Sequence, residues 1–371
     1  MHIAIFGCGQ LAQMTAQAGI PHGYRFSFIA DEDEDARCVD DLGAVVVFQE
    51  GMTAEALFSA LEQPDVITVE KEMVNAQLLS DLQSHTAVYP NSNAIYLSQN
   101  RIREKNFLRH NGIPTADFEI IESQAQLDSL PERLGLPIYI KAAESGYDGY
   151  NQWRIQSPDD LAQVTLNESV QLIAEKHVDY TREISVIAAR NATGDIVYYP
   201  LMENRHEEGV LIATMAPAPN TDVILEEGAV AYMETMLSAL DYVGVLTMEC
   251  FDTPQGLVVN ELAPRVHNSG HWTMEGCKTS QFENHCLAIA NTTLGETTPN
   301  GIGGIVNMLG KHGKESDFSA PEFFYHAYGK EERPRRKLGH IGVLTDSYEQ
   351  LTQQLNVALK QLYGEKYAPY K

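Results

Sequence analysis

The sequence predicts a mixed architecture, with an α/β unit at the N-terminus followed by an α+β unit built on an antiparallel sheet. In residues 2–30 an apolar run, a glycine turn, a helix pattern and a second apolar run follow one another as in a doubly wound sheet. In residues 115–300 apolar strands alternate with turn-prone loops and a long helix pattern, GAVAYMETMLSALDY. Because 371 residues exceed one ordinary core, we expect two or three domains.

Composition narrows the class of protein. The chain is 44% apolar and 21% charged, with a formal charge of −25, which argues against a nucleic-acid partner because phosphates demand a basic surface. No stretch approaches 18 consecutive apolar residues, and the N-terminus lacks a basic leader region, so we expect neither a membrane span nor a signal peptide. The five cysteines form no CxxC pair, which indicates free thiols in a reducing cytoplasm and no zinc site.

The first glycine turn has two interpretations. Gly7 and Gly9 let the backbone turn tightly at a helix N-terminus, where an anion could bind. A nicotinamide dinucleotide is one such anion, with the acidic run at 31–35 contacting its ribose. However, Ala12 replaces the third glycine of the GxGxxG pattern, so the motif is weak.

Two basic residues, Arg101 and Lys141, are candidates for contact with an anion. Residues 94–112 predict one amphipathic helix that ends at Gly112, and its Arg101 either faces solvent or binds an anion. Residues 136–156 predict strand, glycine loop and strand, with Lys141 at the end of the first strand. Lysine and the backbone N–H groups of SGYDG suit a phosphate, although a structural hairpin with a lysine at its edge fits equally well.

Residues 244–273 carry the densest chemistry. The apolar runs GVLTMECF and LVVNEL, joined by DTPQG, predict a β-hairpin. With a turn near Pro254, we expect Glu249 opposite Val259 and Glu261 as its diagonal neighbour on the same face, about 7–8 Å away. A hard cation such as Mg²⁺, completed by phosphate oxygens, would neutralise both carboxylates. A shift of one residue would move Glu261 to the other face, and two solvated acids on a surface hairpin remain the alternative.

Polar and basic segments follow the hairpin. The turn-prone string ELAPRVHNSGHWT places several polar side chains directly after a strand: Arg265, His267, Asn268, Ser269 and His271. A concentrated basic run lies at 329–340, with Lys330, Arg333, Arg335, Arg336 and Lys337. In a chain this acidic the run is predicted to hold an anion, and a solvated loop is the alternative.

Together these features resemble ATP-grasp ligases. The strings GCGQLAQM, SGYDGYNQW, MECFDTPQGLVVNELAPRVHNSGHWT, TSQFENH and RPRRKLGH resemble the 5-(carboxyamino)imidazole ribonucleotide synthase family over about residues 3–345. The resemblance implies an ATP-grasp fold with an N-terminal Rossmann-like preATP-grasp domain and a small β-rich C-terminal domain. Its implied limits are 1–93 for the first domain, 94–300 for the ATP-grasp domain (small lid subdomain about 115–178, large subdomain about 179–300) and 301–371 for the C-terminal domain that closes the substrate site.

The resemblance also implies an activity. The family is a C–N bond-forming ligase that uses ATP and bicarbonate to N-carboxylate 5-aminoimidazole ribonucleotide, through carboxyphosphate, in purine biosynthesis. It implies Mg²⁺, with Mn²⁺ as a substitute, a cytoplasmic homodimer and a functional link to a downstream mutase, with no nucleic acid and no membrane. A different ATP-grasp ligase, or a catalytically weakened nucleotide-binding relative, remains the alternative.

Residue roles carry over by position. The resemblance assigns ATP binding to Arg101, Lys141, Gly146, Tyr147, Asp148, Gly149, Tyr150, Asn151, Gln152, Glu175, Lys176, His177, Val178, Glu183, His206, Asn260 and Glu261. It assigns metal binding to Glu249 and Glu261, and catalysis to Arg265, Asp148 and Tyr147. It assigns ribonucleotide binding to His267, Asn268 and Ser269, with the 5′-phosphate on Lys330, Arg336 and Lys337.

The chain departs from the family pattern in three places. In the flap, Tyr150 stands where a cationic residue is usual and Asn151 replaces a glycine, which removes a charge and stiffens the loop. Residues 71–73 read KEM where FEN is common, and Arg335 replaces a glycine. These changes spare the metal carboxylates and Arg265, so we expect a working enzyme.

Overall fold

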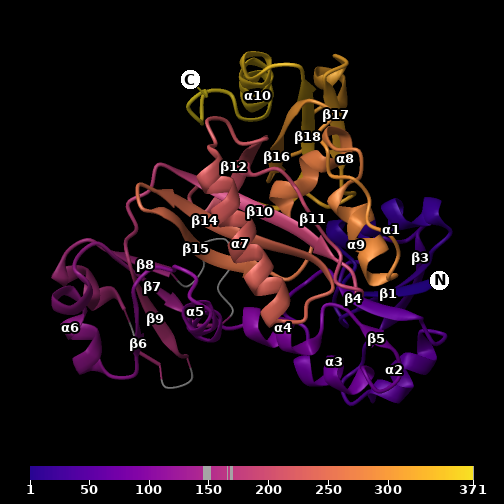
Figure 1. Ribbon diagram of the computed structural model, residues 1–371, viewed down its shortest axis with the longest axis horizontal. Helices are drawn as coiled ribbons and strands as arrows, with labels where there is room; N and C mark the ends of the chain where they lie inside the picture. Colours follow the sequence, from indigo (N-terminus) through magenta and orange to yellow (C-terminus); the bar gives the residue numbers. More distant parts are fainter. Residues whose placement is uncertain (145–151, 165, 168–169, 371) are drawn as a thin grey trace.

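The computed structural model describes residues 1–144, 152–164, 166–167 and 170–370 (Figure 1). The flap positions Gly146, Tyr147, Asp148, Gly149, Tyr150 and Asn151 lie outside the described residues. Among the helices that the structure describes, none is long and apolar enough to cross a membrane. Each of the five cysteines is buried as a free thiol.

The N-terminal unit is the predicted parallel sheet, with strand order β3-β2-β1-β4-β5. Side chains of β1 alternate between two cores: Ile3 and Ile5 pack on the α1 side, whereas Ala4 and Phe6 pack on the side of α2 and α3. The elements are β1 (His2–Phe6), α1 (Gln10–Gly19), η1 (Ile20–His22), β2 (Arg25–Ala30), β3 (Gly43–Val47), α2 (Ala54–Ala60), β4 (Val66–Val69), α3 (Ala76–Leu82) and β5 (Ala87–Val88).

The single helix predicted over 94–112 is wrong, because two helices cover this segment: α4 (Ser92–Ser98) and α5 (Arg101–His110). The side chain of Asn100 accepts the backbone N–H groups of Ile102 and Arg103 and so caps a new helix. Arg101 is therefore the first residue of α5. The boundary proposed between residues 93 and 94 falls inside α4.

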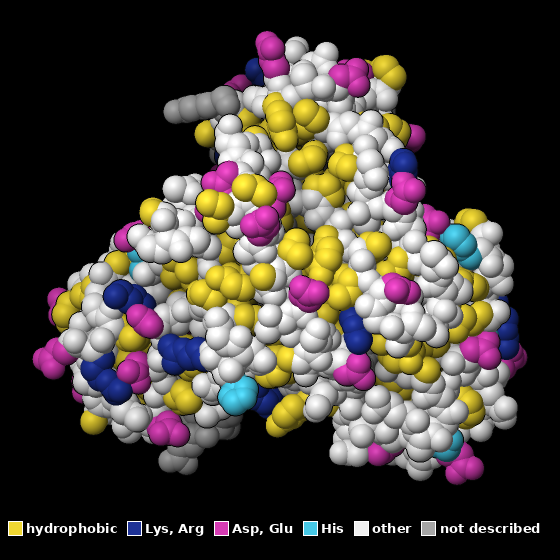
Figure 2. Space-filling view, in the orientation of Figure 1, with side chains coloured by type: hydrophobic (Ala, Val, Ile, Leu, Met, Phe, Trp, Pro, Cys, Tyr) yellow, Lys and Arg dark blue, Asp and Glu magenta, His cyan; other side chains and the backbone are white. Residues whose placement is uncertain are grey.

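A small antiparallel sheet follows, in the order β6-β9-β7-β8. The two predicted strands are confirmed, since β7 and β8 pair with Lys141 opposite Gln152, and most of the segment between them lies outside the described residues. Helix α6 packs its buried leucines on this sheet, and the lobe projects on the left of Figures 1 and 2. Its elements are β6 (Phe118–Ile121), α6 (Gln124–Leu134), β7 (Ile138–Ala142), β8 (Gln152–Ile155), η2 (Pro158–Gln163) and β9 (Leu172–Lys176).

The large sheet runs β15-β14-β10-β12-β13-β16-β18-β17, with β11 beside β10. Alternate residues of β10 face opposite cores: Ile184 and Val186 pack against α7, while Ile187 and Ala189 pack toward α9. The C-terminal strands continue this sheet, with Val306 of β16 opposite Ala213 of β13, and α10 covers β16 and β18.

The elements of the large sheet and its helices are β10 (Arg182–Arg190), β11 (Ile196–Tyr198), β12 (Met202–Glu207), β13 (Val210–Ala216), α7 (Val223–Ala239), β14 (Gly244–Thr253), β15 (Gly256–Ala263), η3 (Asn268–Trp272), α8 (Thr273–Gly276), α9 (Gln281–Ile289), β16 (Ile302–Leu309), η4 (Glu315–Phe318), β17 (Phe323–Ala327), β18 (Lys337–Thr345) and α10 (Tyr348–Tyr363). Helix α1 of the N-terminal unit packs on α9, which joins the two units through apolar side chains. In Figure 1 the small sheet lies at the left, strands β10, β14 and β15 of the large sheet lie in the middle, and the N-terminal unit lies at the lower right.

Candidate active site

A cavity of about 610 Å³ lies where the small and large sheets meet. Residues that the sequence assigned to nucleotide, metal and ribonucleotide line it together: Arg101, Lys141, Gln152, Glu175, Lys176, His177, Val178, Glu183, His206, Glu249, Asn260, Glu261, Arg265, His267, Asn268 and Lys337. Ser269, Lys330 and Arg336 are not among the lining residues.

The hairpin that carries the two carboxylates forms as predicted, but its predicted register is wrong. Val259 lies opposite Cys250 instead of opposite Glu249. An irregularity at Asn260 then adds one residue to β15, and Glu261 lies directly opposite Glu249. Directly opposed side chains have Cβ atoms about 4.5–5.5 Å apart. Direct opposition thus brings the Cβ atoms of the two residues closer together than those of the predicted diagonal pair.

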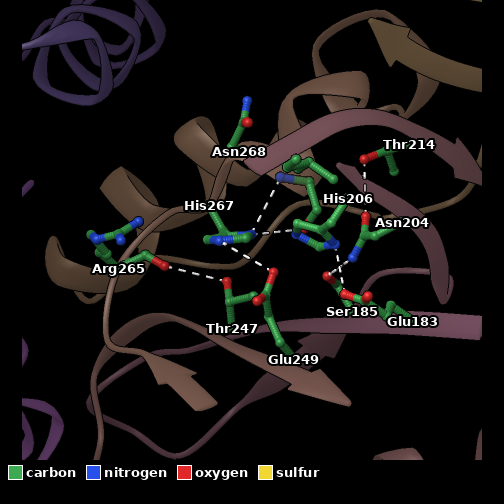
Figure 3. Close-up of polar contacts among 12 residues, drawn as sticks. Glu183, Ser185, Asn204, His206, Thr214, Thr247, Glu249, Arg265, His267 and Asn268 are labelled. Carbon is green, nitrogen blue, oxygen red and sulfur yellow. Dashed lines mark hydrogen bonds and ion pairs between the residues drawn. The ribbon is translucent and has the colours of Figure 1, made fainter. Parts of the chain in front are cut away.

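Glu249 is partly buried, with its side chain 13% exposed, and one of its oxygens is fully buried and unsatisfied. Its Oε1 accepts no hydrogen bond from the residues that the structure describes, and Nε2 of His267 is 3.6 Å away. Burial raises the pKa of Glu249, against the opposing charge of His206, and Glu261 raises it further. Figure 3 shows Glu249 on its strand facing the two imidazoles. A cation at this position would satisfy the oxygen and relieve the repulsion.

The donor set fits a hard cation shared with a ligand. Among the described residues there is no group of three or more His, Cys, Asp and Glu side chains that could hold a metal ion by itself. The two opposed carboxylates and the amide of Asn260 supply oxygen donors, and all three residues line the cavity. Mg²⁺ in nucleotide sites is commonly bound by one or two carboxylates, with substrate phosphates and water completing the octahedron. The residues therefore fit Mg²⁺ bound together with phosphate.

His206 pairs with Glu183 at the cavity wall. Its Nδ1 forms an ion pair with Oε2 of Glu183 at 2.6 Å. Burial alone would lower the pKa of His206, but Glu183 and Glu249 outweigh burial and raise it. The hydroxyl of Tyr180 donates to the other oxygen of Glu183 at 3.0 Å. Glu183 is thus held at both oxygens at the cavity wall.

His267 is neutral and has a defined orientation. Burial, followed by the charges of Arg265 and Lys337, holds the pKa of His267 well below its usual range. Nδ1 accepts the backbone N–H of Ser269 at 3.3 Å, which leaves the proton on Nε2, facing Glu249. Ser269 is fully buried, and its hydroxyl oxygen lies 2.8 Å from Nδ1 of His267.

Glu175 holds the lysine that was predicted to contact phosphate. Its Oε2 accepts from Nζ of Lys141 at 2.7 Å, and Nζ of Lys105 lies 3.3 Å from Oε1. Burial would raise the pKa of Glu175, but the two ammonium groups lower it to about 2. The carboxylate is therefore ionised and fixes Lys141 at the cavity wall, next to the segment Lys176–Val178.

Arg265 is paired with an acid that the sequence analysis did not assign to the site. Its Nη2 lies 2.8 Å from Oε1 of Glu72, and its backbone oxygen accepts from the hydroxyl of Thr247 at 3.4 Å (Figure 3). Glu72 follows β4, at the carboxyl edge of the parallel sheet where ligands of α/β folds bind. That position is the signal by which Glu72 could have been found.

The structure divides the basic run between two places. Lys337 lines the cavity. Lys330 donates to the side chain of Gln10, and Nη2 of Arg336 lies 3.8 Å from Asp35. Lys330 and Arg336 therefore face the N-terminal unit beside the glycine turn.

The glycine turn is filled by the chain itself. The backbone N–H groups of Gly9 and Ala12 donate to the two oxygens of Glu70. A Cβ at Gly7, where φ is +112°, would lie 2.4 Å from Cγ of Glu70, so glycine is required for this close approach. The predicted anion at this helix N-terminus is an internal carboxylate, which removes the basis for a dinucleotide.

Three known protein domains match successive parts of the chain. Residues 1–99 match the ribonucleotide synthetase preATP-grasp domain, residues 106–282 the ATP-grasp domain, and residues 304–354 the phosphoribosylaminoimidazole carboxylase C-terminal domain. The fold and the cavity are those of an ATP-grasp enzyme.

Individual relatives agree over the full length. N5-carboxyaminoimidazole ribonucleotide synthase of Pseudomonas aeruginosa is 39% identical over 92% of this chain and 93% of its own. The chain belongs to the N5-carboxyaminoimidazole ribonucleotide synthase family. A crystal structure of the synthetase from Thermus thermophilus has a TM-score of 0.91 and 37% identity, covering 100% of both chains. A synthase from Aspergillus clavatus, in complex with ADP and 5-aminoimidazole ribonucleotide, has a TM-score of 0.87 and 26% identity over 97% of this chain and 98% of its own.

Proposed function

We propose that this protein catalyses the ATP- and bicarbonate-dependent N-carboxylation of 5-aminoimidazole ribonucleotide in purine biosynthesis. The observation that carries the proposal is the opposed pair Glu249 and Glu261, with a buried unsatisfied oxygen, in one cavity with Lys141 and Arg265. Membership of the synthase family over nearly the whole chain supports the same reaction. The products are the N-carboxylated ribonucleotide, ADP and phosphate.

The nucleotide would bind along the junction of the two sheets. Lys141 and Arg101 hold its phosphates, the backbone of 176–178 meets the adenine edge, and Glu183 accepts from the ribose hydroxyls. Glu249 and Glu261 would hold Mg²⁺, whose charge would offset that of the phosphates. Bicarbonate would attack the γ-phosphorus of the nucleotide held by Lys141 and Arg101. Lys141 is fixed by Glu175, so its ammonium does not need to be ordered on binding.

Arg265 would stabilise the carboxyphosphate that results. Its pairing with Glu72 holds the guanidinium at the cavity wall, and a preorganised cation costs little reorganisation during reaction. His267 and Asn268 would contact the ribonucleotide. The amide of Asn268 exchanges hydrogen bonds with Asn307 in both directions, which fixes its orientation.

Lys330, Arg336 and Lys337 would hold the 5′-phosphate. Binding there requires Lys330 to exchange Gln10, and Arg336 to exchange Asp35, for phosphate oxygens. Tyr147 and Asp148 of the flap would close over the reacting groups and exclude water from carboxyphosphate. We further propose a cytoplasmic homodimer whose product passes to a mutase.

The experiment is a coupled ADP-release assay with Mg²⁺, run with and without 5-aminoimidazole ribonucleotide and bicarbonate. ADP formation that requires both is the expected result. ATP hydrolysis indifferent to the ribonucleotide, or tight ATP binding without turnover, would contradict the proposal. Sedimentation of the same preparation tests the homodimer, which fails if the chain sediments as a monomer.

A further inference from the structure

Helix α5 carries two adjacent charged residues into the interior. Glu104 is 3% exposed and Lys105 is 1% exposed. A charge taken out of water destabilises the fold unless it is paired and hydrogen-bonded. Both side chains have hydrogen-bond partners on β15, which is far away in the sequence. These contacts identify the part of the structure that the two side chains stabilise.

Those partners lie on either side of Glu261. Oε2 of Glu104 accepts the backbone N–H of Leu262 at 3.2 Å. Nζ of Lys105 donates to the backbone oxygen of Asn260 at 3.1 Å. Strand β15 is the edge of its sheet, and a bulge leaves backbone groups without ladder partners. The carboxyl group of Glu104 and the ammonium of Lys105 satisfy such groups immediately after and before Glu261.

Lys105 also reaches the phosphate side of the cavity. Its Nζ donates to Oγ1 of Thr115 at 3.0 Å, and that hydroxyl donates to the backbone oxygen of Val259 at 3.0 Å. The same Nζ lies 3.3 Å from Glu175, whose other oxygen binds Lys141 at 2.7 Å. One buried ammonium therefore touches both the bulged strand and the group that fixes the phosphate-binding lysine.

We propose that Glu104 and Lys105 are positioning residues for the metal carboxylate. They hold the bulge that brings Glu261 opposite Glu249, and Lys105 fixes the distance between Glu261 and Lys141. This inference rests on the proposed function to the extent that Glu261 binds the cation of a metal–nucleotide complex. Lys105 is not among the residues that line the cavity, whereas Glu104 is; both contact the backbone on either side of Glu261, and they act on the cation site through that carboxylate.

The test is binding of Mn²⁺, used as a paramagnetic probe, to the full chain with ADP present. Lys105→Met removes the ammonium and keeps the length of the side chain. We expect the dissociation constant for Mn²⁺ to rise about tenfold, as for other changes behind a metal ligand. Lys278→Met, which removes a surface lysine paired with Glu296, is the matched control and should stay within about twofold of wild type.

Two further variants separate positioning from folding. Glu104→Gln keeps an oxygen that can accept from Leu262, so it should rescue Mn²⁺ binding that Glu104→Leu loses. A lowered thermal midpoint with wild-type Mn²⁺ affinity in Lys105→Met and Glu104→Leu would show a merely structural role and overturn the proposal. If Lys105→Met does not fold, Thr115→Val takes its place. Wild-type Mn²⁺ affinity in both Thr115→Val and Glu104→Leu would then overturn the proposal.

Turnover provides the second readout. The Mg²⁺ concentration for half-maximal activity should rise in parallel with the Mn²⁺ constant, while the KM for the ribonucleotide stays within about twofold. The two proposals can fail separately, because Mn²⁺ binding with ADP needs no ribonucleotide. A wild-type protein that binds Mn²⁺ with ADP but shows no ribonucleotide-dependent turnover refutes the carboxylase assignment and leaves the variant comparison intact.

Discussion

The glycine turn and the hairpin each contain a buried carboxylate, and they treat it in opposite ways. In the turn, both oxygens of Glu70 accept backbone N–H groups, from Gly9 and Ala12. In the hairpin, Oε1 of Glu249 accepts none from the described chain. Burial raises the pKa of both acids. The difference teaches that a buried acid whose oxygens are satisfied supports the fold, whereas one with an unsatisfied oxygen facing a cavity is ready for a ligand.

The hairpin side of this comparison predicts the largest effect. Glu261→Gln keeps the shape of the side chain but removes a charge from the cation site. We expect turnover to fall about 1,000-fold, because a metal ion contributes several kcal/mol to charge stabilisation. Ribonucleotide-dependent ADP release measures this, and the thermal midpoint should change little. Activity near that of wild type would refute the metal assignment.

The turn side predicts a loss of stability instead. Glu70→Ala leaves the N–H groups of Gly9 and Ala12 without their acceptor, which should lower the free energy of unfolding by about 2–4 kcal/mol. Urea unfolding monitored by circular dichroism measures the change. Glu70→Gln retains one acceptor oxygen and should fall between the two. An alanine variant as stable as wild type would mean that Glu70 does not support the turn.

The smallest predicted effect is on the pH dependence of stability, and it concerns the ion pair between His206 and Glu183. The pKa of His206 is raised in the folded protein, so its ion pair with Glu183 stabilises fully below the unfolded value of 6.5. That stabilisation is lost as pH rises through the raised pKa. The pKa of Glu183 is lowered in the folded protein. The stabilisation that its carboxylate contributes is therefore present above the unfolded value of 4.5 and is lost as pH falls through the lowered pKa.

His206→Gln should therefore be less stable than wild type by about 1 kcal/mol near pH 6, with the difference shrinking toward pH 9. Urea unfolding without nucleotide at a series of pH values measures it. A difference that grows with pH would contradict the assigned ion pair.

The sequence identified the hairpin and its carboxylates but not their register. Counting from the turn assumes regular pairing, which placed Glu249 opposite Val259. The bulge at Asn260 is supported by Lys105, 155 residues earlier in the chain, and no local pattern reports such a contact. Lys105 and Glu104 did leave a signal, since they lie at helical spacing from the buried residues Ile102 and Leu108. Charges on the apolar face of a helix indicate buried partners.

The filled glycine turn could have been anticipated in part. Strands β1 and β4 are parallel neighbours, so the turn after Phe6 and the acid after Val69 end at the same edge of the sheet. The apolar run that begins at residue 2 predicted β1. Glu34 of the 31–35 run enters the turn as well, since it accepts the backbone N–H of Cys8 at 2.8 Å. That both acids would reach the turn depends on strand order, which single segments do not contain.

Residues 301–371 have a consequence for making fragments of this protein. Strand β16 pairs with β13 from Ala213↔Val306 to Ala216↔Gly303, so a chain cut at residue 300 would bare the ladder groups of β13 in the middle of the large sheet. Bare apolar strand edges recruit other chains. A fragment ending there should aggregate unless another strand replaces β16. The C-terminal strands therefore protect the large sheet from aggregation by covering the edge of β13.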